Sequence, residues 1–479
     1  MGFLRRHKRK LAVLAAIVLV PLLLHVAVGL ATTIEPPSVG TGPLPVTEQD
    51  GVRRAGRAWT AVRAGVRALY LEGSPEEMGA AHVSLLRQNM IDDEAEMWAL
   101  FAHFVPVSAL RTLIMDISRV QYRHVDRGIP EPRRREVAAE ASAFVPDPFT
   151  GKLPTYQRLV FLHAMYDIAL SFERSPLIGC TAWGVGPSLT KDGHVLVGRA
   201  FDFEAGDAFD KDKDVVFYAE DGRIPLASVG WPGLSGTVTG MNLEGVMLVV
   251  HGGRARDPRA EGIPVVFSLR ETLGRAHDAE EAIDILSKQE VMVSHIVFVA
   301  DAKGRFAVVE RAPGEKAYAR RPEDPARMAV TNHFEGPLRG DPRDDAVRAG
   351  TTSIDRRVRA DELLGAIAPS SLDAKGAIAL LRDHKCPKGI ACDLGDRRSL
   401  AALIATHGVV ADLTDKVLWV SRGPHLSGAF VRFDLARAFA KGHDPAADPP
   451  PETIDEDPIL KDGRYDEGRT RALRPTAKQ

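Results

Sequence analysis

The pattern of apolar and polar positions divides the chain into unlike parts. Residues 11–31 form an apolar run that only Pro21, His25 and Gly29 interrupt. Residues 76–100 and 157–172 carry apolar side chains at three- and four-residue spacing with few Gly or Pro, which predicts helices. We therefore expect the region 48–178 to be mainly helical.

Short β-rich runs bounded by turn residues dominate from residue 180 onward. The expected strands are 181–185, 194–198, 215–218, 246–251, 295–299, 306–310, 328–330 and 417–421, and the expected helices are 268–289, 353–367 and 374–382. Asp192-Gly193 and Lys303-Gly304 have the composition of hairpin turns. This order of elements predicts an α+β layer structure with a largely antiparallel sheet.

The two ends of the chain carry targeting and tail patterns. A basic cluster at residues 5–10 precedes the apolar run 11–31, which at about 1.5 Å per residue can cross a hydrocarbon core of about 30 Å. We expect residues 1–31 to be a signal anchor that places the protein in a membrane, facing the periplasm or the cell exterior; the alternative is a cleaved signal peptide and a secreted or periplasmic protein. Residues 32–47, rich in Pro, Gly and Thr, are expected to be a linker, and residues 444–479 a disordered tail.

Composition narrows the function. The 62 Lys and Arg against 64 Asp and Glu give a net charge of -2, which argues against an electrostatic nucleic-acid binder. Three cysteines are too few for a disulfide scaffold or a four-cysteine zinc site. The sequence has no P-loop, His-Glu-x-x-His or Gly-x-Gly-x-x-Gly motif, and the run Gly233 to Gly236 lacks the spacing of a serine nucleophile elbow. We expect neither a cofactor nor a metal.

Cys180 is the main candidate for chemistry. It lies at the joint between the helical and β-rich parts, after Gly179, which permits a strained backbone. A lone cysteine is commonly a small buried hydrophobe, but an unpaired thiol in an exported protein is worth attention. Cys386 and Cys392, close in sequence around Pro387 and Gly389, can form a small disulfide loop. A hairpin turn at residues 190–194 would return Arg199 and Asp202 to the side of Cys180.

Five motifs occur in order from residue 179 onward. They are Gly179-Cys-Thr181, Asp192-Gly193, Gly198-Arg-Ala-Phe-Asp202, Gly240-Met-Asn-Leu-Glu-Gly245 and Val330-Thr-Asn-His-Phe334, and the upstream run Leu71 to Gly79 adds a sixth. With them the sequence resembles the acyl-CoA:6-aminopenicillanate acyltransferase family of N-terminal-nucleophile (Ntn) cysteine hydrolases, which is related to choloylglycine hydrolases and acid-ceramidase-like amidases. The resemblance covers roughly residues 69–435. Two positions depart from the pattern, Ala200 where Asn is usual and Val83 where Gly is usual, which puts substrate choice in doubt.

The resemblance implies a four-layer αββα sandwich and self-cleavage between Gly179 and Cys180. Residues 48–179 would be a helical pro-segment, residues 180–443 the catalytic β segment, and the two fragments would stay associated without a covalent bond. Cys180 would then be both nucleophile and N-terminus, and its α-amino group, with a pKa of about 7.7–8.0, can accept the thiol proton.

The resemblance also assigns further residues to the site. Asp202 would orient the α-amino group, Arg199 would steady charge on the thiolate or carbonyl, and Asn332 would be an oxyanion donor. Backbone N–H groups near His251 and Gly252 are candidates for a second donor, and Arg356 matches a further arginine of the family, although a helix-face charge is an equal interpretation.

We thus expect a self-processing cysteine amidase or acyltransferase that acts on a small N-acyl or acyl-thioester substrate through a thioester at Cys180. The alternatives are a lipid or ester deacylase of the same fold, and a catalytically degenerate Ntn-fold binding protein.

Overall fold

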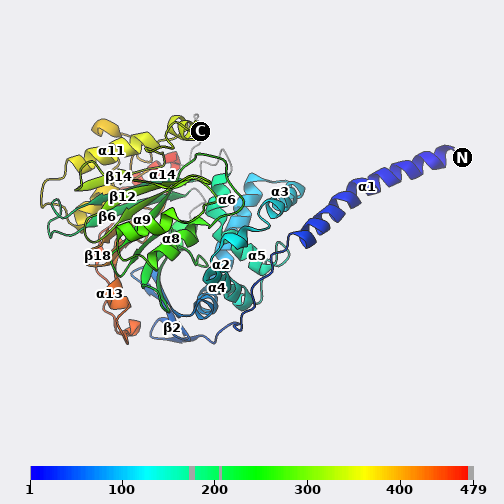
Figure 1. The fold of residues 1–479 in the computed structure, drawn as a ribbon, viewed down its shortest axis with the longest axis horizontal. Helices are drawn as coiled ribbons and strands as arrows, with labels where there is room; N and C mark the ends of the chain where they lie inside the picture. The colour runs from blue at the N-terminus through cyan, green and yellow to red at the C-terminus, as the bar shows by residue number, and fades with distance from the viewer. Residues whose placement is uncertain (1, 172–177, 204–207, 473–479) are drawn as a thin grey trace.

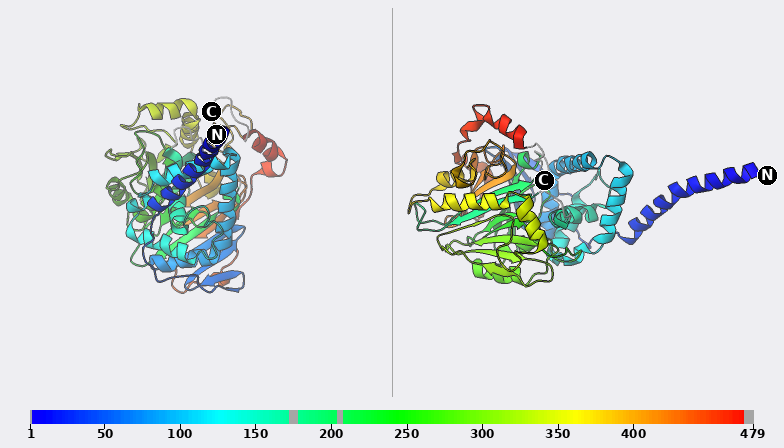
Figure 2. Two further views of the ribbon diagram at one scale, coloured as in Figure 1. Left: turned by 90° about the vertical axis from the view of Figure 1, so that its right-hand side faces the viewer. Right: turned by 90° about the horizontal axis from the view of Figure 1, so that it is seen from above.

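The computed structural model describes residues 2–171, 178–203 and 208–472. Helix α1 (Gly2–Ala31) projects away from a body in which the other elements pack together (Figure 1). Residues 32–46 have no regular structure, as expected of a linker, although Ile34 is buried in the core of the body. The second view in Figure 2 shows the same long excursion of α1 from the body.

Two sheets form the centre of the body. The larger has the strand order β1 (Thr47–Gln49), β2 (Val52–Ala55), β3 (Ala58–Arg63), β4 (Val66–Gly73), β7 (Asp214–Glu220), β8 (Leu226–Gly230), β9 (Thr239–Asn242), β10 (Met247–Gly252), β11 (His295–Ala300), β12 (Phe306–Arg311) and β13 (Tyr318–Arg320). The smaller has the order β14 (Arg327–Val330), β5 (Ile178–Val185), β6 (Leu196–Phe203), β15 (Ala405–Asp412), β16 (Val417–Ser421), β17 (Phe430–Asp434) and β18 (Thr453–Ile454).

Helices cover the outer face of each sheet (Figure 1). On the larger sheet these are α2 (Pro75–Phe104), α8 (Val265–Leu273) and α9 (Ala279–Ser287). Helices α4 (Glu131–Ala143), α5 (Thr155–His163) and α6 (Met165–Ser171) pack on these helices and on one another, and α3 (Ser108–Gln121) packs on α1 and α2. The smaller sheet is covered by α11 (Ser353–Gly365) and α12 (Ala374–Leu381), with α10 (Pro342–Gly350) before them. The remaining α-helices of the described residues are α7 (Ala208–Lys211), α13 (Leu435–Ala438) and α14 (Arg464–Ala472). The 3-10 helices are η1 (Val125–Gly128), η2 (Pro387–Gly389), η3 (Pro445–Ala447) and η4 (Pro458–Leu460).

Three buried clusters show that the layers are αββα. One cluster lies between the two sheets and joins residues such as Val197 of β6 to Val249 of β10. A second lies between the larger sheet and its helices, and a third between the smaller sheet and α11 and α12. Alternate residues of each strand therefore face different clusters, as the period of two requires. The expected four-layer sandwich is confirmed.

The N-terminal segment is part of the larger sheet. Strand β4 pairs with β7 over seven residues in a parallel register, from Arg67 opposite Asp214 to Gly73 opposite Glu220. The other strand pairs between named strands in the described chain are antiparallel, which confirms the largely antiparallel prediction. Ser74 caps the N-terminus of helix α2. Its side chain accepts a hydrogen bond from the N–H of Glu77, and the Glu77 side chain accepts one from the N–H of Ser74.

Three expectations about secondary structure are wrong. The mainly helical region does not begin near residue 48, because residues 47–73 form the strands β1 to β4. The helix expected over 268–289 is broken between α8 and α9, where Gly274 follows α8 and the Asp278 side chain caps α9. The expected disordered tail is ordered from 444 to 472, because β18 extends the smaller sheet and Ile459 and Ala472 are buried; residues 473–479 lie outside the described residues.

The length and apolar character of the described helices bear on the expected membrane segment. Over the described residues, no single helix is both long and apolar enough to cross a membrane, and residues 19–31 count only as a shorter apolar helix. Helices α2 and α3, bent by 114° at the break between them, meet the criteria of length and composition only as a pair. This result does not support the membrane-spanning segment expected at residues 11–31.

Candidate active site

The β5–β6 hairpin brings the predicted residues together. Gly179 lies opposite Asp202, Cys180 opposite Phe201, and Ala182 opposite Arg199. Because paired residues of neighbouring strands point to the same face, Cys180 and Arg199 share the face toward the larger sheet, while Gly179 and Asp202 share the other face. The Asp192-Gly193 turn thus produces the neighbourhood that the sequence predicts.

The backbone of Cys180 is held by two side chains from distant elements. Its N–H donates to Asn332 Oδ1 at 2.7 Å, and its carbonyl accepts from Arg356 Nη1 at 2.5 Å. Arg356 lies on α11 and also donates to Thr181 Oγ1 at 2.8 Å and to Asn332 Oδ1 at 2.9 Å. Arg356 is therefore not a helix-face charge in solvent, since it is 4% exposed and contacts the residue it was expected to approach.

Gly179 packs closely against Asp202. A Cβ atom added to Gly179 would lie 3.2 Å from Asp202 Oδ2 and 3.3 Å from Asp202 Cβ. A side chain at this position would push the carboxylate away, so the glycine permits the close approach. Asp202 is itself buried, at 3% exposure, beside the peptide bond that joins residues 179 and 180.

The environment of the Cys180 thiol combines burial with two cations. Cys180 is a free, fully buried cysteine. Burial raises the pKa of its thiol, while Arg199 and Arg356 act to lower that pKa and Asp202 acts to raise it. The thiol is therefore protonated near neutral pH, and removal of its proton needs a base.

Arg199 is fixed by groups that the sequence did not single out. It donates to the carbonyl of Val250 at 2.8 Å and to Thr239 Oγ1 at 3.4 Å, and its guanidinium lies 4.8 Å from the centre of the Phe201 ring. His407 of β15 stacks on Phe201 with ring centres 5.0 Å apart, and its Nε2 lies 3.0 Å from Thr239 Oγ1. These contacts join four strands, β6, β9, β10 and β15, and Thr239, Val250 and His407 lie outside the motifs of the sequence.

Asn332, His251 and Gly252 meet at the end of β10. The Asn332 side chain donates from Nδ2 to the carbonyl of Gly252 at 3.0 Å. His251 is fully buried, and burial together with Arg199 and Arg356 lowers the pKa of its imidazole well below the usual value. In the uncleaved chain the Asn332 amide group is thus engaged at both ends, and its role as oxyanion donor stays a prediction.

A cavity opens beside the peptide bond that joins Gly179 and Cys180. It has a volume of about 640 Å³, and its walls include Gly179, Asp202, Gly252, Asn332 and Arg356. Arg254, Arg256, Arg343 and Arg397 line it further out. The space is large enough for a small organic substrate to approach the residues around Cys180.

The other two cysteines form a separate feature. Cys386 and Cys392 are joined by a disulfide, with Cα atoms 5.7 Å apart. They lie in the loop after α12 and do not line the cavity beside Gly179. Their sulfur atoms are bonded to each other and are not thiolate ligands for a metal.

Comparisons with known proteins agree with the motifs. Residues 188–393 match the model of the family described as acyl-coenzyme A:6-aminopenicillanic acid acyl-transferase. The match begins after Cys180 and covers less than half of the chain, and it includes Arg199, Asp202, Asn332 and Arg356. No curated protein matches the chain.

Several solved structures are similar to it at low identity. The N-acylethanolamine-hydrolyzing acid amidase ortholog of Caenorhabditis elegans has 16% identity and a TM-score of 0.37, over 49% of this chain and 93% of that one. Penicillin V acylase from Agrobacterium tumefaciens has 18% identity and a TM-score of 0.34, over 53% and 91%. A conjugated bile acid hydrolase mutant from Clostridium perfringens has 15% identity and a TM-score of 0.39, over 58% and 97%.

These structural scores are too low to say anything about this chain's substrate. The family match and the αββα layers do bear out the resemblance that the motifs indicate. The chain is similar, over residues 188–393, to the acyl-coenzyme A:6-aminopenicillanic acid acyl-transferase family.

Proposed function

We propose that the protein is a self-processing cysteine amidase or acyltransferase that cleaves itself between Gly179 and Cys180. The observation that carries the proposal is the way Cys180 is held. Its N–H and carbonyl are bound by Asn332 and Arg356, and a large cavity adjoins the preceding peptide bond. These two side chains fix the peptide groups on both sides of the Cys180 α-carbon, including the nitrogen that cleavage would release.

Cleavage would convert the peptide nitrogen of Cys180 into a catalytic base. One water molecule is consumed, the Gly179–Cys180 bond breaks, and a Gly179 carboxylate and a Cys180 α-amino group form. An α-amino group has a pKa of about 7.7–8.0, so in its neutral form it can take the proton of the adjacent thiol. Asn332 Oδ1, now 2.7 Å from this nitrogen, would accept a hydrogen bond from the amine and orient it.

The reaction with substrate would then proceed through a thioester. The Cys180 sulfur attacks the acyl carbonyl of an N-acyl compound, the C–N bond breaks, and the amine leaves with the proton from the thiol. Water resolves the thioester to a carboxylate in an amidase, and a second amine resolves it in an acyltransferase. Arg199 and Arg356, both buried near the sulfur, favour its thiolate form.

We also propose that the two fragments remain associated after cleavage. The N-terminal fragment would contain β1 to β4, and β4 pairs with β7 of the C-terminal fragment over seven residues. The same fragment supplies Leu69 and Leu86 to the core cluster that contains Cys180. Its departure would expose both a strand edge and this apolar core.

Mass spectrometry of the purified protein tests the processing. We expect two fragments, one with Cys180 at its N-terminus, and a single uncleaved chain for Cys180→Ala. The double variant C386S/C392S is the matched control, since it alters the other two cysteines and should still be cleaved. A wild-type protein that stays one chain after prolonged incubation would contradict the proposal.

A panel of N-acyl amides and matching esters tests the activity. We expect release of the free acid from amides by the processed protein and none from Cys180→Ala, and hydroxylamine should trap the acyl group as a hydroxamate. Turnover of esters alone would instead favour the lipid deacylase. Export of the chain stays a prediction, and fractionation of expressing cells with an activity assay on each fraction tests it.

A further inference from the structure

The loop between β8 and β9 forms one wall of an apolar cavity next to the site. The cavity has a volume of about 130 Å³ and includes Phe201, the residue opposite Cys180 in the β5–β6 pair. Trp231 to Leu234 of the loop form one side. The facing side comes from the N-terminal segment and includes Met90, Met97, Leu162 and Tyr166, together with the carboxyl groups of Asp93 and Glu94.

Two histidines of the N-terminal segment hold this loop by its backbone. His82 of α2 accepts at Nε2 from the N–H of Gly233 at 3.0 Å. His163 of α5 accepts at Nε2 from the N–H of Ser235 at 3.0 Å. Both imidazoles are buried, at 1% exposure or less, so water does not replace these bonds.

Glu140 of α4 completes the attachment. Its carboxylate accepts a hydrogen bond from the Ser235 hydroxyl, and its Oε1 lies 3.3 Å from His82 Nδ1. Burial acts to raise the pKa of Glu140, but hydrogen bonds and charge from its neighbours outweigh burial, so the pKa is lowered and the group is ionised. Three helices of the N-terminal segment therefore bind one short loop of the catalytic segment.

The hydrogen bonds require both histidines to be neutral. A ring nitrogen that accepts from an N–H cannot carry a proton, so Nε2 of each ring is unprotonated. The other nitrogen of His163, Nδ1, donates to the carbonyl of Leu159 at 2.8 Å, and burial lowers the pKa of this imidazole. Protonation of either ring would set two N–H groups against each other and break the contact with the loop.

The grouping of Ser235, His82 and Glu140 resembles a catalytic triad in composition but cannot act as one. All three side chains are fully buried. The Ser235 hydroxyl donates to Glu140 rather than to a histidine, and His82 Nε2 is occupied by the Gly233 N–H. A nucleophilic serine needs a free base and access to substrate, and this serine has neither. The group is built to hold the loop.

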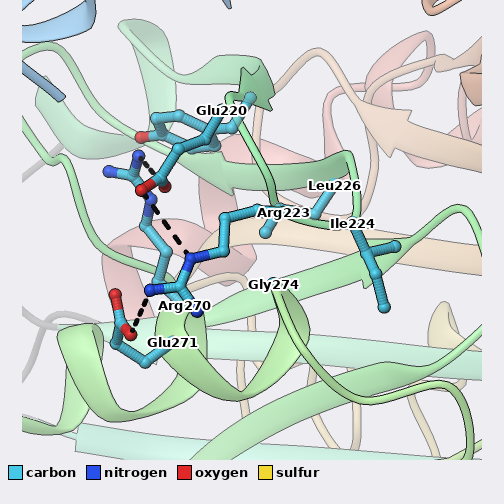
Figure 3. Close-up of a pocket in the computed structure, with 8 residues that line it drawn as sticks. Glu220, Arg223, Ile224, Leu226, Arg270, Glu271 and Gly274 are labelled. Carbon is cyan, nitrogen blue, oxygen red and sulfur yellow. Dashed lines mark hydrogen bonds and ion pairs between the residues drawn. The ribbon is translucent and has the colours of Figure 1, made fainter. Parts of the chain in front are cut away.

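Charged residues surround the cluster from the other side. Arg270 of α8 donates to the Ser235 carbonyl, pairs with Glu136 at 2.8 Å and lies 3.7 Å from the centre of the Tyr218 ring. Figure 3 shows Arg270 close to Glu220 and Arg223 close to Glu271. Arg133 of α4 adds contacts to Glu136, Glu220 and Glu271. The Arg270 charge acts to lower the pKa of His163, and the Glu140 charge acts to raise it.

We propose that His82, Glu140 and His163 are positioning residues that set which acyl chains the enzyme accepts, by fixing Trp231 to Leu234 as the wall of an acyl-chain cavity. The proposal rests on the acyl-transfer function proposed above. Under this proposal the N-terminal fragment contributes residues to the substrate site and is not a segment that is discarded. Acidic conditions that protonate His163 should break its hydrogen bond with the Ser235 N–H, release the wall and weaken the discrimination between chain lengths.

The test compares N-acyl amides whose straight acyl chains increase by one two-carbon step at a time. We expect the wild-type enzyme to favour a narrow range of lengths, and His163→Ala to reduce the ratio of kcat/KM between neighbouring lengths by about five- to tenfold, since the Ser235 N–H loses its acceptor. His163→Gln, whose side-chain oxygen can accept from the same N–H, should restore the ratio. A variant that merely contained less folded enzyme would lower all rates equally and leave the ratio unchanged.

Two further measurements sharpen the result. On acidification the wild-type ratio should fall, whereas the double variant H82Q/H163Q, which cannot titrate at these positions, should keep its ratio. His194→Gln is the control, because His194 lies in the hairpin turn and pairs with Asp412 at the far end of the strand from Cys180. Unchanged chain-length ratios in His163→Ala, or an equal acid loss in H82Q/H163Q, would overturn the proposal.

A binding assay separates this proposal from the amidase function. In the Cys180→Ala background, calorimetry with straight-chain fatty acids of increasing length should show a length dependence that His163→Ala abolishes and His163→Gln restores. If no N-acyl amide is turned over but fatty-acid binding depends on chain length in this way, the amidase function is refuted and the proposal about the cavity wall is supported. If amides are turned over and no variant changes the length dependence, the wall fails and the amidase function stands.

Discussion

Asn332→Ala should weaken the protein more than the loss of one side chain usually does. Asn332 is 5% exposed and makes three hydrogen bonds, accepting from the Cys180 N–H and from Arg356 and donating to Gly252. At about 1 kcal/mol for each neutral bond and about 2 kcal/mol for the bond from the guanidinium, the loss is about 4 kcal/mol. The alanine also leaves two buried donors without an acceptor.

Denaturant unfolding in the Cys180→Ala background measures this loss on a single uncleaved chain. Asn89→Ala is the matched control, because Asn89 donates a side-chain hydrogen bond to Asp212 at 2.9 Å and its loss should cost about 1–2 kcal/mol. With Cys180 restored, Asn332→Ala should also slow the appearance of the Cys180 fragment, since the scissile nitrogen loses its acceptor. An Asn332→Ala chain as stable as Asn89→Ala, or cleaved at the wild-type rate, would refute the reasoning.

Three other outcomes are expected. Burial, then Asp212 and Asp214, raise the pKa of Asp93 to about 8, so the folded chain binds a proton that the unfolded chain lacks between about pH 4 and 8. Because of this group, the free energy of unfolding decreases by about 1.4 kcal/mol for each unit by which the pH rises in that window. Asp93→Asn should remove this pH dependence from unfolding curves recorded across the range. Cys392→Ser should cost about 2 kcal/mol without reductant and nothing with it, because the bridge closes a small loop; equal losses in both would contradict this. Gly198→Ala should lower the melting temperature strongly, since the new Cβ would lie 2.2 Å from the Trp183 ring, whereas Gly365→Ala, with open space around it, should not.

The sequence pattern of residues 179–202 was enough to predict the centre of the candidate site. The Asp192-Gly193 turn sets the register of β5 and β6, and the register alone places Asp202 opposite Gly179 and Arg199 two residues from the thiol. The family motifs added Asn332 and Arg356, which come from a different strand end and from α11. Contacts of this kind depend on tertiary packing, and a single sequence reaches them only through resemblance.

The errors have equally local causes. In β2 to β4, buried positions such as Val52, Leu69 and Leu71 lie on strands only eight residues long or shorter, and the longer helical pattern that follows outweighed them. His82, Glu140 and His163 join three helices to a loop near residue 235. The spacing of these three residues in the sequence does not predict the contacts. The tail was misjudged because few apolar residues suffice to dock it: Ala472 packs with Ala402 and Ile404.

The parallel pairing of β4 with β7 has a consequence for the lifetime of the enzyme. Before cleavage the strands belong to one chain, and refolding after a thermal excursion is a unimolecular event. After the proposed cleavage the same pairing would join two molecules, so recovery would require them to meet, and dilution would work against it. The working enzyme would thus persist by unfolding slowly, and its useful life would be governed by a barrier rather than by an equilibrium.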